Sequence, residues 1–179
     1  MKKQLNEKQL LLKIRLLTLF FMAALIVSGI TAFPLETELK IASSVLGISP
    51  DIPVDSYSGF RHWIAWIYEG VRNTNEHYPF LAYGTDWLAF AHIMISLAFV
   101  GLLFDPAHNK WTIYWAMLMC ICVIPTAFIC GAIREIPLYW QLVDCSFGVF
   151  GLIPLFLLHK YVGKLEYKSE MRQENEVKV

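Results

Sequence analysis

The sequence lacks every short motif that would point to a particular catalytic chemistry. It contains no G-x-S-x-G, no H-E-x-x-H, no phosphate-binding loop and no dinucleotide fingerprint. Four cysteines are present without a C-x-x-C, which argues against a disulfide-oxidase or epoxide-reductase mechanism, since both need a reactive pair. The basic residues form no patch interleaved with aromatics, so no nucleic-acid partner is expected. Any activity therefore has to be argued from individual side chains.

The sequence also has few residues suited to holding a metal or a haem. Of its five histidines, only His92 lies well inside a long apolar run, whereas b-type haem normally needs two axial histidines. Histidines outside these runs have no compact ligand spacing with Glu69 or Glu76. We predict no metal and no cofactor, and keep a redox or haem-binding membrane subunit as an alternative.

Long apolar runs are abundant. Hydrophobic residues make up 56% of the 179 residues and aromatic residues 15%, and they cluster into runs that approach the ~20 residues needed to cross a bilayer. We therefore predict an all-α polytopic membrane protein, a four-transmembrane-helix bundle in one domain over residues 16–160. The expected helices cover residues 16–33, 87–104, 111–131 and 138–158.

Charge is distributed unevenly along this neutral chain. The arm 1–15 and the tail segment 159–179 each hold five Lys or Arg, while residues 34–86 hold three basic residues against seven acids. By the positive-inside rule, both termini are cytoplasmic, and the arm 1–15 and the tail 161–179 flank the domain. The tail is expected to be a short helical extension that frays into disorder. We expect a bacterial inner (plasma) membrane location and an uncleaved first helix, because Ile30-Thr31-Ala32 is a poor cleavage site.

Residues 34–86 are predicted to form a structured outer lid between the first two spans. Apolar residues at helical spacing predict an amphipathic helix from Leu35 to about Gly47, and a connector with two prolines follows. A second amphipathic helix, capped by Asp55 or Ser58, is expected to run to about Arg72.

The candidate site centres on an acid and a histidine inside apolar runs. Asp144 lies four or five residues inside the Tyr139-Trp140 aromatic belt, where a carboxylate is costly unless it is paired or faces a cavity. His92 lies at a matching depth beyond Trp87. If the two side chains meet, Asp144 could fix the tautomer of His92 and raise its pKa, which makes the pair candidate catalytic residues. An interfacial carboxylate and a structural histidine are the alternatives.

Four further residues complete the candidate ligand-binding set with His92 and Asp144. They are Ser96, one turn below His92, Arg134 and Glu135 in the turn above, and Gly148, one turn below Asp144. The glycine belongs to a small-residue groove that either packs a helix or admits a ligand. Cys130 and Cys145 are both near the outer side, and we expect the cysteines to act as buried small apolar residues.

The layout broadly resembles the sterol-isomerase and sigma-2-receptor type of bundle. Ile124-Pro125 and Ile153-Pro154 are the local similarities, and the resemblance implies four helices around a ligand pocket. The pocket acids of such proteins have no clear match in the first two spans here, so the resemblance extends to architecture alone.

Three functions remain open. We favour a non-enzymatic ligand-binding or accessory bundle with an outer-facing polar pocket. Its expected partners are the lipid bilayer, an apolar small molecule or lipid, and a membrane-protein partner or a second copy. The alternatives are an intramembrane enzyme that uses His92 and Asp144 on a lipid-like substrate, and the redox subunit.

Overall fold

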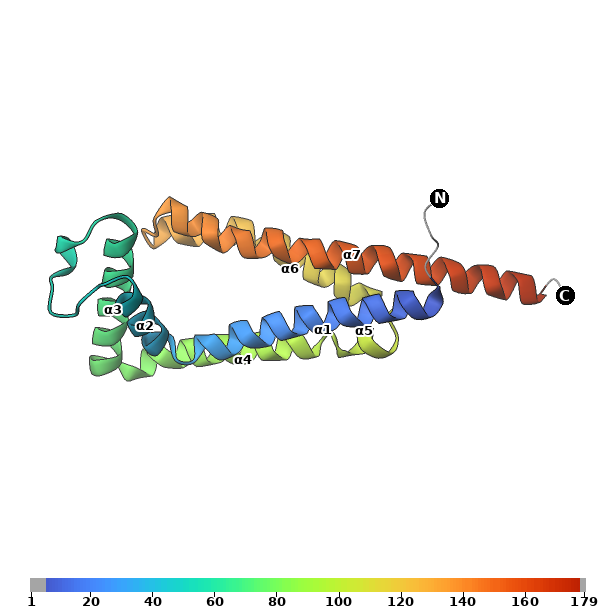
Figure 1. Ribbon diagram of the computed structural model, residues 1–179, viewed down its shortest axis with the longest axis horizontal. Coiled ribbons are helices and arrows are strands. Elements are labelled where there is room, and N and C mark those ends of the chain that lie inside the picture. Colours follow the sequence, from blue (N-terminus) through green and yellow to red (C-terminus); the bar gives the residue numbers. More distant parts are fainter. Residues whose placement is uncertain (1–5, 178–179) are drawn as a thin grey trace. The chain divides into compact units, whose positions relative to one another are not determined.

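A computed structural model describes residues 6–177, with side chains to residue 175. This part of the chain is helical, without strands (Figure 1), and divides into two units: residues 6–23 with 96–177, and residues 24–95. In chain order the helices are α1 (Glu7–Ala32), α2 (Leu35–Val45), η1 (Val54–Ser56), α3 (Gly59–His77), η2 (Pro79–Ala82), α4 (Tyr83–Leu97), α5 (Val100–Phe104), α6 (Lys110–Ile133) and α7 (Leu138–Val177).

The first unit contains an antiparallel hairpin of α6 and α7, in which one glycine faces the backbone of the other helix and a second faces a side chain (Figure 1). A Cβ atom on Gly148 would lie within 2.4 Å of the carbonyl oxygen of Cys120, and one on Gly131 would lie 2.6 Å from the amide carbon of Gln141. Such distances leave no room for a side chain. The hairpin is therefore built on small-residue contacts of the kind that join helices in membranes.

The turn of this hairpin ends α6 with a Schellman arrangement. The Ile136 N–H donates to the Gly131 carbonyl at 2.9 Å and the Glu135 N–H to the Ala132 carbonyl at 3.5 Å. Glu135 has a φ of 55°, in the left-handed region that glycine usually fills. Gln141 is buried and its Nε2 donates to the Ile136 carbonyl at 2.7 Å, so the first turn of α7 fixes this corner.

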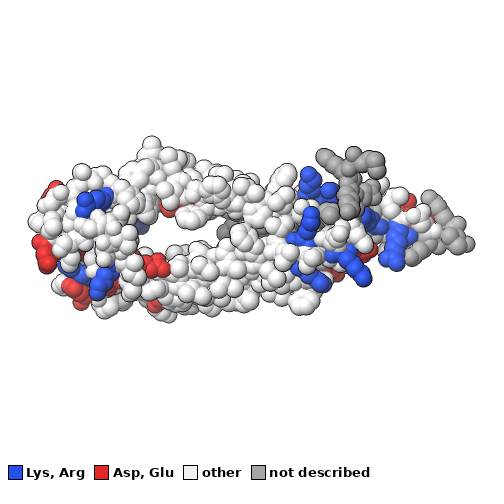
Figure 2. All heavy atoms as spheres, viewed as in Figure 1, with Lys and Arg blue, Asp and Glu red and all other residues white. Residues whose placement is uncertain are grey.

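At its other end, the first unit has an apolar core surrounded by basic residues. Core side chains come from four helices, and each is no more than 9% exposed: Leu10, Ile14, Phe99, Leu102, Ile113, Leu155, Leu158, Val162 and Leu165. Figure 2 shows Lys and Arg gathered over the end of this unit where α1 begins and α7 continues. Arg15 Nε donates to the Leu103 carbonyl at 3.0 Å, and Lys110 pairs with Glu166.

The second unit combines the adjoining parts of α1 and α4 with α2 and α3. Gly29 of α1 packs against α4, because a Cβ there would lie 2.8 Å from the Ala89 carbonyl oxygen. The amphipathic helices α2 and α3 pack on each other, and Asn75 donates to Glu36 at 2.7 Å. The lid, residues 34–86, is thus folded structure and not a linker.

Four helical segments are long and apolar enough to cross a membrane. They are Glu7–Ala32, Pro79–Phe104, Lys110–Ile133 and Leu138–Asn175. Large apolar side chains on them point outward, among them Phe147 at 70% and Phe150 at 67% exposure. Extended apolar surface of this kind is typical of contact with lipid or with another protein.

Two helices extend beyond the expected spans. Helix α1 begins at Glu7, before residue 16, and α7 continues past residue 158 to Val177, through the tail in which a short helical extension was expected. Apolar content marks only the part of a helix suited to lipid, whereas Lys, Glu, Gln and Met continue the helix outside it. Residues 1–5 and 178–179 of the predicted arm and tail lie outside the described residues.

The expected second span is also interrupted. Instead of one helix over residues 87–104, α4 and α5 are separated at Ala98-Phe99, where the Phe99 N–H donates to the Ser96 carbonyl at 3.1 Å in a 3₁₀-type contact. In the lid, Ser58 occupies the N-cap position of α3 without a side-chain capping bond, and Asp55 lies in η1. Helix α3 continues past Arg72 to His77.

Candidate functional site

Asp144 lies on α7, inside the hairpin of the first unit. In sequence it falls between Gln141 and Gly148, two of the residues that contact α6, and Pro125 lies between Cys120 and Gly131, the residues that these two contact. The side chain is half-buried, and no described residue donates a hydrogen bond to its carboxylate or forms an ion pair with it. A half-buried carboxylate on an apolar helix has to be protonated, or has to meet a cation or hydrogen-bond donor other than the described residues.

The other expected residues of the first unit have structural partners or lie at the surface. Ser96 is fully buried and its hydroxyl donates to the Met22 carbonyl at 3.3 Å, so it ties α4 to α1. Arg134 and Glu135 are exposed in the turn between α6 and α7. The Cys120 carbonyl occupies the space where a side chain at position 148 would lie, so helix packing is sufficient to explain why this residue is a glycine.

His92 belongs to the second unit, and its tautomer is set by its own helix. Its Nδ1 lies 2.8 Å from the Leu88 carbonyl oxygen, which can only accept, so Nδ1 carries the proton and neutral Nε2 is left as an acceptor. Asp144 is therefore not needed to fix the tautomer. Its pairing with His92 stays a prediction, since the two residues belong to different units.

All four cysteines are free thiols. Only Cys145 is buried, while Cys122 and Cys130 are exposed, so the expectation that the cysteines are buried apolar residues is wrong for those two. Proximity in sequence to an apolar run does not determine which way a side chain faces on a helix. Among residues 6–177, no three His, Cys, Asp or Glu side chains gather as metal ligands would.

The lid contains a small hollow that the sequence did not indicate. We call it the lid hollow: one wall is the connector from Ile48 to Val54, and the other is a stripe of α3. It has a volume of about 230 Å³. The stripe consists of Ala65, Tyr68, Glu69 and Arg72, whose spacing of three and four residues places them on one helix face.

Side-chain contacts hold the connector against α3. Arg61 Nη2 donates to the Gly47 carbonyl at 2.7 Å, and its guanidinium lies 5.1 Å from the centre of the Tyr57 ring. The Tyr57 hydroxyl accepts from the Ser49 N–H at 2.9 Å, and His62 Nδ1 lies 3.1 Å from the Val54 carbonyl oxygen. Pro50 and Pro53 further restrict the connector. The hollow is thus preformed, as ligand sites usually are.

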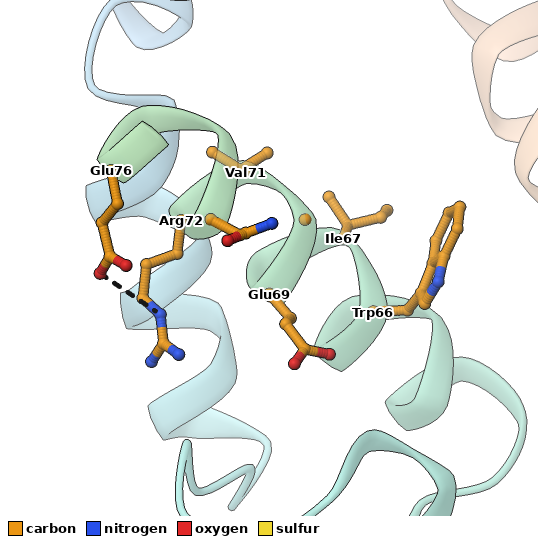
Figure 3. Close-up of a pocket in the computed structure, with 8 residues that line it drawn as sticks. Trp66, Ile67, Glu69, Val71, Arg72 and Glu76 are labelled. Carbon is orange, nitrogen blue, oxygen red and sulfur yellow. Dashed lines mark ion pairs between the residues drawn. The ribbon is translucent and has the colours of Figure 1, made fainter. Parts of the chain in front are cut away.

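Arg72 is the cation of the lid hollow and is loosely paired. Its Nε lies 3.9 Å from the Glu76 carboxylate, beyond hydrogen-bond distance, and this buried nitrogen has no hydrogen-bond partner among the described residues. Figure 3 shows Arg72 and Glu76 with Glu69 on one side of α3, and Ile67 and Val71 on the other. A guanidinium with unused donors is suited to a carboxylate or phosphate.

A second depression, of about 590 Å³, lies along α3 alone (Figure 3). Its lining residues all belong to this helix, between Trp66 and Glu76, so it is an open surface and not a two-walled site. Glu69 and Arg72 line both spaces. The lid hollow is the better candidate because a ligand there would be enclosed by two chain segments.

Sequence reasoning missed all three charged residues of the lid hollow: it took Glu69 as solvated surface, Arg72 only as the end of a helix and Asp51 only as part of the connector. A signal was present: the α3 stripe repeats at helical spacing directly after a connector with two prolines. What the sequence did not indicate was the fold of that connector back along α3, which depends on the Arg61, Tyr57 and His62 contacts.

Compared with models of protein families, with curated proteins and with solved structures, the chain gives no match. The resemblance to the sterol-isomerase type of bundle therefore stays an interpretation of the sequence. Its function has to be argued from the described side chains.

Proposed function

We propose that the protein is a non-enzymatic, ligand-binding integral membrane protein. It crosses a bacterial inner membrane four times with both termini in the cytoplasm, and its lid holds a small ligand on the outer side. Four sufficiently long apolar helices support the crossing, and the excess of basic residues near both termini supports the orientation. The observation that carries the ligand-binding role is the preformed lid hollow with the under-used Arg72 in its wall.

The lining of the lid hollow selects the chemistry of the ligand. Arg72 can bind a carboxylate, and Asp51 and Glu69 can bind an ammonium group. Much of the remaining wall is apolar and suits an aliphatic part of the ligand; the apolar part includes Ile48, Ile52 and Val54. A volume of about 230 Å³ is below the ~300–1,000 Å³ of sites for drug-sized ligands. We infer that the ligand of the lid hollow is a small zwitterion of amino-acid size, and not the apolar small molecule or lipid expected from the sequence.

Binding of amino acids to the purified full-length protein tests this function. Titration calorimetry in detergent, with a panel of aliphatic amino acids, should give saturable binding to the unaltered protein. Arg72→Gln should weaken it by at least tenfold, because a charge-assisted hydrogen bond contributes roughly 1.5–3 kcal/mol. Lys40→Gln removes an exposed cation elsewhere in the lid and should leave binding unchanged. Absence of saturable binding, or equal binding by Arg72→Gln, would refute the proposal.

An intramembrane acid–base enzyme is the second candidate, favoured by two observations. His92 keeps Nε2 as a free acceptor in its neutral form, and the carboxylate of Asp144 has no partner among the described residues. If the two cooperate, His92→Gln and Asp144→Asn should each abolish the same lipid modification in membranes while protein levels remain normal. Unchanged lipid composition on deletion of the whole protein would remove this candidate.

A further inference from the structure

The basic end of the first unit joins two helices that the sequence places at opposite ends of the chain. Lys13 Nζ of α1 lies 5.5 Å from the centre of the Tyr161 ring of α7, and Glu7 of α1 lies 4.0 Å from Arg172. Apolar side chains of both helices are buried beneath these contacts, including Ile14 and Val162 at 0% exposure. The cations of both helices therefore belong to one surface.

Four exposed cations stand at the boundary between the apolar and polar parts of these helices. Arg15 directly precedes the apolar run of α1, and Lys13 lies half a turn before it. On α7, Lys160 directly follows the apolar run, and Lys164 is one turn further. We call these four residues the basic collar. In a protein that crosses a bilayer, this is the level of the lipid headgroups.

Neighbouring acids leave the collar with excess positive charge. Glu166 is paired with Lys110, Glu7 faces Arg172, and Asp105 lies 2.9 Å from His108 Nδ1. Arg15 uses Nε for the Leu103 carbonyl, and its two terminal nitrogens donate no hydrogen bond to described residues. Guanidinium and ammonium groups in this state are the donors that phosphate binds.

We propose that the basic collar binds the phosphate groups of anionic phospholipids in the cytoplasmic leaflet and thereby ties α1 to α7. The site rests on the membrane crossing proposed above but is independent of the lid hollow. The ligand follows from charge complementarity and from position: two exposed cations on each of two helices lie next to the place where the apolar run of that helix gives way to polar residues.

Lipid binding by the purified full-length protein tests the collar. In native mass spectrometry with titrated lipid, phosphatidylglycerol should bind more tightly than phosphatidylcholine with the same acyl chains. The double variant Lys160→Gln, Lys164→Gln should lower the phosphatidylglycerol affinity roughly 30-fold, since each surface cation contributes ~1 kcal/mol toward anionic lipid. Both lysines are exposed, so the variant should fold.

Two controls make the result specific. Lys160→Arg with Lys164→Arg keeps both charges at the same positions and should retain the phosphatidylglycerol preference. Lys40→Gln removes an exposed cation of the lid and should have no effect. Equal binding of the two lipids would overturn the proposal in favour of a solvated surface or an acidic protein partner, and so would full binding by the glutamine variant. Amino-acid binding in the lid would be unaffected by either result.

Discussion

The α6–α7 hairpin and the lid hold their backbones in place by opposite means. In the hairpin, glycines bring one helix against the backbone of the other, as at Gly148 and the Cys120 carbonyl. In the lid, long polar side chains reach across to backbone carbonyls, as Arg61 does to Gly47. The first arrangement depends on the absence of side-chain atoms and the second on their presence.

This difference indicates which solvent each region suits. Close packing of small residues does not need water and is effective between helices in lipid, where burial of apolar surface contributes little. Polar contacts such as the hydrogen bond from exposed Arg61 to the Gly47 carbonyl, and that from the Ser49 N–H to the Tyr57 hydroxyl, are compatible with an aqueous or interfacial setting. The polar contacts also leave a two-walled hollow, whereas the glycine contacts close the space between the helices.

The largest effect is expected from adding a methyl group to the hairpin. Gly148→Ala should lower stability by about 1–3 kcal/mol, because the new Cβ would clash with a backbone carbonyl that cannot move without the helix. Gly163→Ala on the same helix has open space around its Cβ and should be neutral or stabilising by up to ~1 kcal/mol. Thermal unfolding in detergent measures both. Equal effects at the two positions would show that the hairpin does not depend on this contact.

Much of the architecture was predictable because apolar runs and turn residues are local signals. The four candidate spans and both lid helices follow from runs such as residues 111–131 and from the amphipathic pattern after Leu35. Helix ends were less predictable, since the polar residues of the arm and tail carry no lipid signal but favour helix. The start of α1 at Glu7, inside the arm, is the clearest case, whereas a short helical extension was expected in the tail.

The candidate site was less predictable because it depends on side-chain directions. The Ser96 hydroxyl donates to the Met22 carbonyl, and the Cys120 carbonyl lies close to Gly148, which is the packing alternative for this glycine; a ligand at either residue stays a prediction. Conversely, Arg72 was expected only as the end of a helix, and the connector that folds beside it makes it part of the lid hollow. The rotation of a helix and the path of a connector are set by tertiary contacts that periodicity does not encode.

A smaller effect is expected from removing the polar contacts of the lid. Arg61→Gln loses the hydrogen bond to the Gly47 carbonyl and the contact with the Tyr57 ring, and should destabilise the protein by about 1 kcal/mol. It should also weaken amino-acid binding, because the connector forms one wall of the lid hollow. Lys40→Gln is the matched control, because it removes another exposed cation of the lid. If stability falls but binding does not, the connector is not part of the ligand site.

The smallest effect, of opposite sign, is expected at the turn of the hairpin. Glu135 adopts a φ of 55°, which costs an L-residue roughly 1–2 kcal/mol, whereas glycine adopts it freely but loses more chain entropy on folding. Glu135→Gly should therefore raise stability by about 0.5 kcal/mol in thermal unfolding. Glu135→Ala removes the carboxylate and keeps the strained backbone, so it should give no such gain. A gain with alanine as large as with glycine would mean that loss of the charge, and not relief of the backbone, stabilises this corner.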